Sequence, residues 1–219
     1  MGAGNDFPID LVLLGGIAAF LVLRLRSILG RREGFERPTE AMPGVTPGPT
    51  PVANMAPVPA APSRVMPDPA STVGQALARL AGLDPGFQPD RFLDGAEGAF
   101  RIIVTAFAAG DRVRLHPLLS DDTYKAFEGA IAARETSGEA QRTEIQAIPS
   151  ATIEDAMVHD RTATITVRFV SDQVNLTLDR AGAPVVGTDA VTEITDLWTF
   201  ERALGNPDPT WRLVAARSA

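Results

Sequence analysis

A proline-rich stretch divides the chain and limits what its middle can fold into. From Pro38 to Pro69 about one residue in three is proline. Proline lacks an amide donor and fixes φ, so neither a helix nor a sheet can propagate through such a segment. The composition predicts an extended spacer over residues 33–70 that tethers what lies on its two sides. The alternative interpretation is a ligand for a proline-binding module.

An apolar run precedes this spacer, from Phe7 to Leu23, interrupted only by Asp10. Its length is at the short end of what crosses a hydrocarbon core of about 30 Å. A secretory signal carries its positive charge before the apolar run and a small-x-small cleavage site after it. Here the arginines follow the run, so residues 1–32 are predicted to be a retained transmembrane anchor rather than a cleaved signal. An interfacial helix is the alternative, but it needs a wide polar face. The anchor side chains are Phe7, Leu11, Leu14, Ile17, Phe20 and Leu23.

The basic residues after the run predict an orientation. Basic residues that flank a span stay on the cytoplasmic side. We therefore expect a single-pass inner-membrane protein with a periplasmic amino terminus and a cytoplasmic carboxy-terminal domain. The same side chains can bind anionic lipid, each contributing on the order of 1 kcal/mol. Gly15-x-x-x-Ala19 within the anchor leaves self-association open. The residues given both roles, topology and lipid binding, are Arg24, Arg26, Arg31 and Arg32.

Charge and composition exclude several classes of function. The net charge is −7, and an acidic domain repels phosphate backbones, so we expect no nucleic acid partner. The chain has no cysteine, which excludes a disulfide scaffold, a thiol nucleophile and cysteine-bound zinc. His116 and His159 do not form a metal-spaced pair and are interpreted as ordinary surface or loop residues. We predict neither a metal site nor a cofactor.

Helical periodicity dominates the part after the spacer. Helices are predicted over residues 71–82, 90–110 and 120–138, because the first and third begin at a capping residue and all three end at or near a glycine. The helix over residues 90–110 has the clearest apolar stripe. That stripe consists of Leu93, Ala96, Phe100, Ile103, Val104 and Phe107.

The hydrophobic period then changes from 3.6 to 2. Residues 162–169 alternate strictly, which predicts a strand with one buried face. Helices followed by an antiparallel meander of about four strands indicate an α+β domain over residues 71–219, with helices on one face of a curved sheet. Strands or strand continuations are expected at residues 144–148, 162–169, 174–178, 194–200 and 211–215, with turns at 180–182 and 204–209.

Residues that could carry out chemistry are few. The sequence has neither a Gly-rich phosphate loop nor a Gly-x-Ser-x-Gly motif. Some cone-shaped α+β domains isomerise steroids with a carboxylate base and a tyrosine, and Tyr124 lies close in sequence to Asp121 and Asp122. Both aspartates also suit the first turn of a helix, where the helix dipole favours negative charge. We predict that the chain is not an enzyme.

The large apolar side chains have two interpretations. Either they fill the core, or some of them line a cavity that takes an acyl chain or an apolar segment of a partner. The candidate pocket or partner-binding residues are Phe100, Ile103, Val104, Phe107, Phe127, Trp198, Phe200 and Trp211.

Three segments carry a resemblance to a known family. They are an anchor ending in FLVLRLRSILGRR, then FLDGAEGAFRIIVTAFAAGDRVRLHPLLSDDTYKAF, and finally VTEITDLWTFERALGNPDPTWRLVAA. The chain resembles bacterial, chiefly alphaproteobacterial, relatives of the subunit that tethers the import motor to the mitochondrial presequence translocase, the Tim44-like family. The resemblance covers the anchor and nearly all of residues 85–219.

The resemblance implies a cone-shaped fold like that of nuclear transport factor two, with a hydrophobic pocket. It implies an adaptor in protein translocation or complex assembly, and contact with anionic lipid such as cardiolipin through the helix at Val73–Gly82 and the start of the helix at Asp90–Gly110. The mitochondrial member recruits a heat-shock-seventy-class chaperone through an N-terminal region, where this chain has a proline spacer, so that role is not carried over. The alternative function is a small-molecule or lipid-handling enzyme or carrier that uses the pocket.

Overall fold

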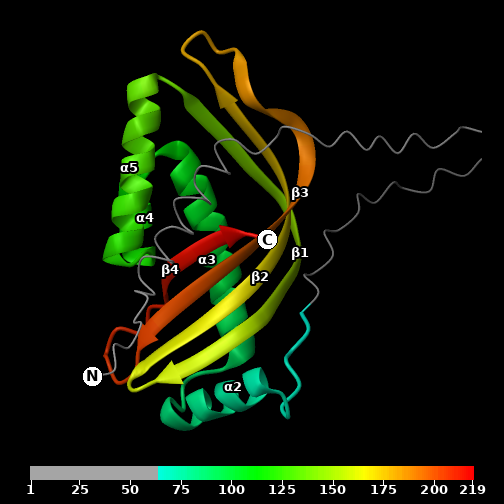
Figure 1. Cartoon of the computed structure of the whole chain (residues 1–219), viewed down its shortest axis with the longest axis vertical. Coiled ribbons are helices and arrows are strands. Elements are labelled where there is room, and N and C mark those ends of the chain that lie inside the picture. Colours follow the sequence, from blue (N-terminus) through cyan, green and yellow to red (C-terminus); the bar gives the residue numbers. More distant parts are fainter. Residues whose placement is uncertain (1–63) are drawn as a thin grey trace, which may run out of the picture.

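The computed structural model describes residues 64–219, in which helices come first along the chain and strands follow (Figure 1). The predicted anchor at residues 1–32 and most of the predicted spacer lie outside the described residues. Among residues 64–219, no helix combines the length and the apolar composition needed to cross a bilayer.

The predicted helices are confirmed, with ends that differ by one or two residues. Ser71 accepts a hydrogen bond from the Gly74 amide at 3.0 Å and caps the first helix. Gly110 and Gly138 end the two longer helices in the left-handed conformation, at φ 71° and 74°. The helices are α2 (Thr72–Leu83), α3 (Pro89–Ala109), α4 (Arg112–Leu115), the 3-10 helix η1 (His116–Leu118) and α5 (Asp121–Ser137).

One expectation is corrected. The segment containing His116 and Pro117 was expected to be a loop, but it is helical. Residues 112–118 form α4 and η1, which begin where the Asp111 side chain accepts a hydrogen bond from the Arg114 amide at 3.1 Å. Each of these helices is too short to show a hydrophobic period, so periodicity could not reveal them.

Four antiparallel strands form a single sheet in the order β1-β2-β3-β4, which confirms the predicted meander and the α+β class. The strands are longer than their alternating segments suggested. In β1 the pairing register shifts three times, and each shift interrupts the strict alternation by which a strand is recognised. The strands are β1 (Ala140–His159), β2 (Thr162–Leu178), β3 (Pro184–Ala203) and β4 (Arg212–Ser218).

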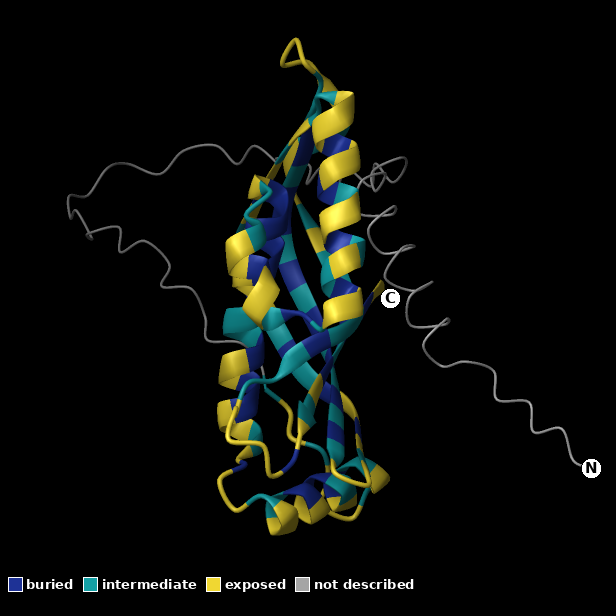
Figure 2. Cartoon of the chain, turned by 90° about the vertical axis from the view of Figure 1, so that its left-hand side faces the viewer, coloured by how far each residue is buried: buried dark blue, intermediate teal, exposed yellow. Residues whose placement is uncertain are grey.

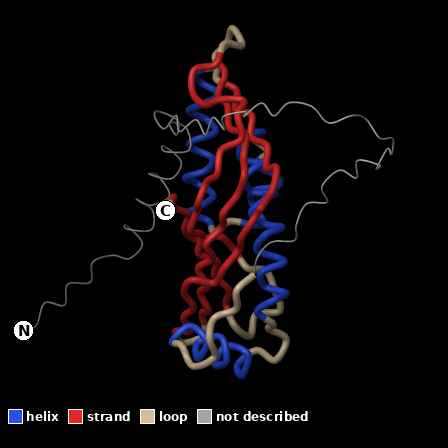
Figure 3. Tube along the Cα trace, turned by 90° about the vertical axis from the view of Figure 1, so that its right-hand side faces the viewer, coloured by secondary structure: helices blue, strands red, loops and turns tan. Residues whose placement is uncertain are grey.

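Helices α3 and α5 lie against the concave side of the curved sheet, and α2 lies across one end of the molecule (Figures 1 and 3). Buried residues line the space between helices and sheet, while exposed residues face outward (Figure 2). The strictly alternating part of β2 provides the centre of this core, as predicted. Its inward residues Ala163, Ile165, Val167 and Phe169 have no exposed surface.

Aromatic rings connect the helical layer to the sheet. Phe100 of α3 stacks on Phe169 of β2 with ring centroids 4.6 Å apart, and it contacts Trp198 of β3 at 4.7 Å. Phe107 meets Phe127 of α5 edge-on at 5.1 Å. Because fully burying one such side chain stabilises a fold by roughly 1.5–3 kcal/mol, these contacts fix α3 and α5 on the sheet.

Candidate binding pocket beside Trp211

A pocket of about 310 Å³ opens between the start of α3, η1 and the ends of β3 and β4. We call it the Trp211 pocket. It is lined mainly by apolar side chains, with a few polar and basic groups. The lining residues are Gly86, Phe87, Gln88, Arg91, Phe92, Gly95, Ala96, Ala99, Leu118, Phe200, Arg202, Thr210 and Trp211.

Four aromatic rings form the walls of the pocket. The Phe92 ring meets the half-buried Trp211 ring edge-on, with centroids 4.8 Å apart, and it meets the Phe200 ring at 6.0 Å. The ring of Phe87, from the loop before α3, has its centroid 6.0 Å from that of the Trp211 ring. Edge-on pairs of this kind contribute roughly 0.5–1.5 kcal/mol beyond the area they bury, so the walls hold their shape without an occupant.

Arg202 forms a cationic part of the wall. It projects from β3, makes an ion pair with Asp84 in the loop before α3, and places its guanidinium carbon 5.0 Å from the centre of the Trp211 ring. Burial lowers the pKa of Arg202, but arginine titrates so far above neutral pH that the group stays charged. The ion pair and the ring together hold this guanidinium in place.

Arg91 lies at the mouth of the pocket in a different setting. Its side chain is exposed, and it makes no hydrogen bond or ion pair within the part of the chain that the structure describes. The lining contains two arginines and no carboxylate, whereas the whole chain has a net charge of −7. Because Asp84 balances the charge of Arg202, Arg91 supplies the unpaired positive charge of this pocket.

Of the candidate pocket residues, Phe200 and Trp211 line this pocket. The others pack inside the domain, and none of their side chains is more than 3% exposed. A binding role for any of them stays a prediction. The six interior residues are Phe100, Ile103, Val104, Phe107, Phe127 and Trp198.

Sequence reasoning missed Phe87, Phe92, Arg91 and Arg202. Phe87 lies in the segment DPGFQPD, between the helices predicted over residues 71–82 and 90–110. An aromatic residue inside a proline- and glycine-rich loop was the available signal, because such a ring finds its apolar contacts in other parts of the chain. No local pattern marks Arg202, since its contacts with Asp84 and Trp211 come from the tertiary fold.

The residues considered for steroid-type catalysis do not line the Trp211 pocket. Asp121 and Asp122 are exposed in the first turn of α5, and Asp122 accepts a hydrogen bond from Lys125 at 2.9 Å. Tyr124 is half-buried and meets the exposed His116 ring edge-on at 4.8 Å.

The remaining predictions concern the second histidine, metal binding and lipid contact, and only some of their residues lie in the described part of the chain. His159 is exposed beside Asp160, and residues 64–219 contain no cluster of side chains suited to holding a metal ion. Helix α2, one of the two helices that the resemblance assigned to lipid contact, carries a single basic residue, Arg79. Arg24, Arg26, Arg31 and Arg32 lie outside the described residues.

A family model described as "Tim44-like domain" matches residues 73–218. The chain belongs to the Tim44-like domain family. This confirms the family resemblance that the sequence carries. A search among curated proteins gave no significant match.

Several solved structures are similar in backbone to this Tim44-like chain. The intermembrane space region of chloroplast protein ARC6 is 12% identical, with 60% of this chain and 97% of that chain covered and a TM-score of 0.45. A putative dehydratase of the NTF2-like family from Streptomyces avermitilis is 14% identical (60% and 96% covered, TM-score 0.35). A ketosteroid isomerase-like protein from Erwinia carotovora atroseptica is 13% identical (60% and 96% covered, TM-score 0.32). At such identities a shared backbone says nothing of activity.

Proposed function

We propose that the protein is a membrane-anchored adaptor whose Tim44-like domain holds a protein partner in the Trp211 pocket. Family membership supports an adaptor or tether role in general. The observation that carries the proposal is the composition of the pocket: aromatic walls with two guanidinium groups. Aromatic and arginine side chains dominate the binding energy of protein interfaces, above all where they line a pocket that a partner side chain can fill.

The anchor supplies the location of this adaptor. Residues 1–32 cross the inner membrane once, with the amino terminus in the periplasm and the domain in the cytoplasm. The arginines after the apolar run also bind anionic lipid. At about 3.1 Å per residue, the part of the spacer that precedes Arg64, residues 33–63, gives the domain a reach of roughly 100 Å from the bilayer. Self-association through Gly15-x-x-x-Ala19 is an additional part of the proposal.

The described part of the chain begins at Arg64, which attaches to α3. Arg64 donates to Glu97 of α3 at 2.8 and 3.0 Å and pairs with Asp94 at 2.7 Å. None of these three residues lines the pocket.

Fractionation with protease protection tests the anchored topology. The full chain should stay in the membrane fraction after carbonate extraction. Its domain should resist protease in intact spheroplasts and be digested after lysis. Release by carbonate would refute the anchor, and digestion of the domain in intact spheroplasts would refute the orientation.

A second candidate function is a carrier of a small apolar molecule or lipid. It is favoured by the pocket volume of about 310 Å³, which lies at the lower end of the roughly 300–1,000 Å³ typical of ligand sites. Native mass spectrometry separates the two functions. A carrier keeps a stoichiometric ligand that is lost when the pocket is filled by mutation, whereas the adaptor carries none.

A further inference from the structure

We infer that the Trp211 pocket takes an acidic, apolar segment of the partner protein. One large apolar side chain packs against the aromatic walls, and a neighbouring carboxylate binds Arg91. This inference rests on the proposed adaptor function and specifies the chemistry of the partner.

The size and walls of the pocket select the apolar part of the ligand. A volume of about 310 Å³ lies at the lower end of the range for ligand sites and also suits a single anchoring side chain. Phe87 and Phe92 are each 6% exposed, so the walls are rings already withdrawn from water. An aliphatic or aromatic side chain that enters the pocket buries its own apolar surface against these rings, as anchors of protein interfaces do.

The charges of the pocket select the acidic part. Arg202 is held by Asp84 and by the face of Trp211, while Arg91 stands exposed without an ion-pair partner among residues 64–219. The planar guanidinium group matches a carboxylate with two parallel hydrogen bonds. A basic amphipathic segment would instead bring like charge against Arg91, which costs affinity and slows association. The mouth of the pocket therefore favours a negatively charged segment over a positively charged one.

Polar groups in the lining favour a peptide over a lipid as the source of this carboxylate. Gln88 contributes an amide and Thr210 a hydroxyl, and both can bond to a peptide backbone. We therefore commit to a partner protein as the occupant and treat a lipid as a competing result of the test.

Gly95 offers a way to fill the pocket without removing any of its contacts. It lines the pocket within α3, and a Cβ added there meets nothing within 4 Å. Gly95→Leu should close the pocket, and replacing a helical glycine also favours the helix. Gly129 in α5 is the matched control, because its Cβ would also meet nothing within 4 Å and it does not line the pocket.

The experiment measures binding of labelled peptides to the full-length chain in lipid nanodiscs by fluorescence anisotropy. The probe is a short peptide with one phenylalanine among glutamates, compared with versions in which glutamine or lysine replaces glutamate. We expect the glutamate peptide to bind about tenfold more tightly than the glutamine peptide, with less difference at high salt, and the lysine peptide not to bind. Gly95→Leu should lose about tenfold or more in affinity, Arg91→Gln should lose the preference for glutamate, and Gly129→Leu should bind as the wild type does.

Several results would overturn the inference. Unchanged binding in Gly95→Leu would place the peptide elsewhere. Equal affinity for the glutamate and glutamine peptides, or tighter binding of the lysine peptide, would refute the role of the arginines. Decanoate that binds in a Gly95-dependent manner while the glutamate peptide does not would make the occupant a lipid. Carbonate extraction of native membranes reports separately on the anchor, so failure of the proposed membrane adaptor and failure of the peptide chemistry give different results.

Discussion

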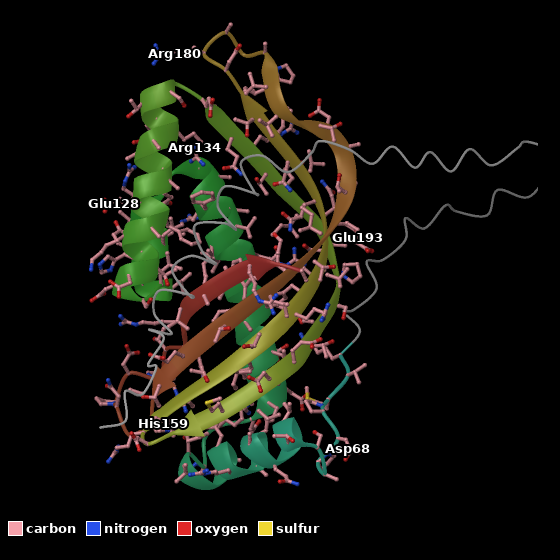
Figure 4. The ribbon with its side chains drawn as sticks, viewed as in Figure 1. Asp68, Glu128, Arg134, His159, Arg180 and Glu193 are labelled. Carbon is pink, nitrogen blue, oxygen red and sulfur yellow. The ribbon has the colours of Figure 1, made fainter. Side chains whose placement is uncertain are left out.

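Arg134 closes the carboxy-terminal end of α3 from inside the domain (Figure 4). Only 6% of this residue is exposed. Its Nη2 donates to the carbonyl oxygens of Phe107 at 2.8 Å and Ala108 at 3.1 Å, and its Nη1 donates to Gln141 at 2.6 Å. Burial lowers the pKa of Arg134. The guanidinium thus takes the place of backbone donors that the helix end lacks, in a site shielded from water.

Arg134→Met keeps much of the side-chain volume and removes these hydrogen bonds. Each hydrogen bond to a charged group contributes about 1.5–3 kcal/mol. The Phe107 carbonyl keeps the Gly110 amide as a donor at 3.2 Å, while the Ala108 carbonyl loses its guanidinium donor. Removing the guanidinium also removes the free-energy cost of burying its charge away from water, and this offsets part of the loss. We therefore expect the free energy of unfolding to fall by about 2–4 kcal/mol.

Urea unfolding of the full-length chain in detergent, followed through tryptophan fluorescence, measures this loss. Arg180 provides the matched control because it closes the end of α5 in the same way, donating to the carbonyl oxygens of Ser137 at 3.1 Å and Thr136 at 2.9 Å, but from an exposed position (Figure 4). Arg180→Met should cost less than about 1 kcal/mol, since water replaces the lost donors. Equal losses in the two variants would refute the argument that burial sets the magnitude.

Two further predictions concern a glycine of α2 and an ion pair. A Cβ on Gly74 would lie 2.1 Å from the Asp68 carbonyl oxygen, so Gly74→Ala should lower the melting temperature. Gly82→Ala should raise it slightly, because a Cβ on Gly82 meets nothing within 4 Å. Equal effects of the two substitutions in a thermal melt would contradict the packing argument. Hydrogen bonding to Arg112 lowers the pKa of Glu135. The stability that this pair contributes is therefore complete above the ordinary glutamate pKa of about 4.3, and it is lost as the pH falls through the lower pKa that Glu135 has in the folded state. Glu135→Gln should remove that part of the acid dependence in urea titrations at several pH values, and an unchanged profile would count against it.

The helices and the centre of the sheet could be predicted because their signals are local. A serine cap at Ser120 and glycine ends at Gly110 and Gly138 act within one turn of the helix that they bound. Residues 162–169 alternate without a bulge and face a continuous helical layer, so their period matches their burial. In these segments the tertiary structure does not override the local preference.

The extent of β1 and the position of the pocket could not be predicted, because both depend on contacts between distant residues. The register shifts of β1 next to Ile145, Ser150 and Asp155 are set by its partner strand. The pocket forms only when a loop residue, Phe87, meets Trp211 from the last part of the chain. Aromatic spacing within one helix instead selected core positions, because core and pocket linings share the same composition.

The central claim is that the membrane-bound protein holds a partner protein in the Trp211 pocket. Photo-crosslinking in native membranes, with benzoylphenylalanine placed at the exposed lining residue Gln88 or, as a control, at Gly129, tests it most directly. We predict a discrete protein adduct from position 88, identified by mass spectrometry as joined through an acidic, apolar segment, and no such adduct from position 129. Adducts of the same protein from both positions, or an adduct at position 88 that consists only of lipid, would contradict the account.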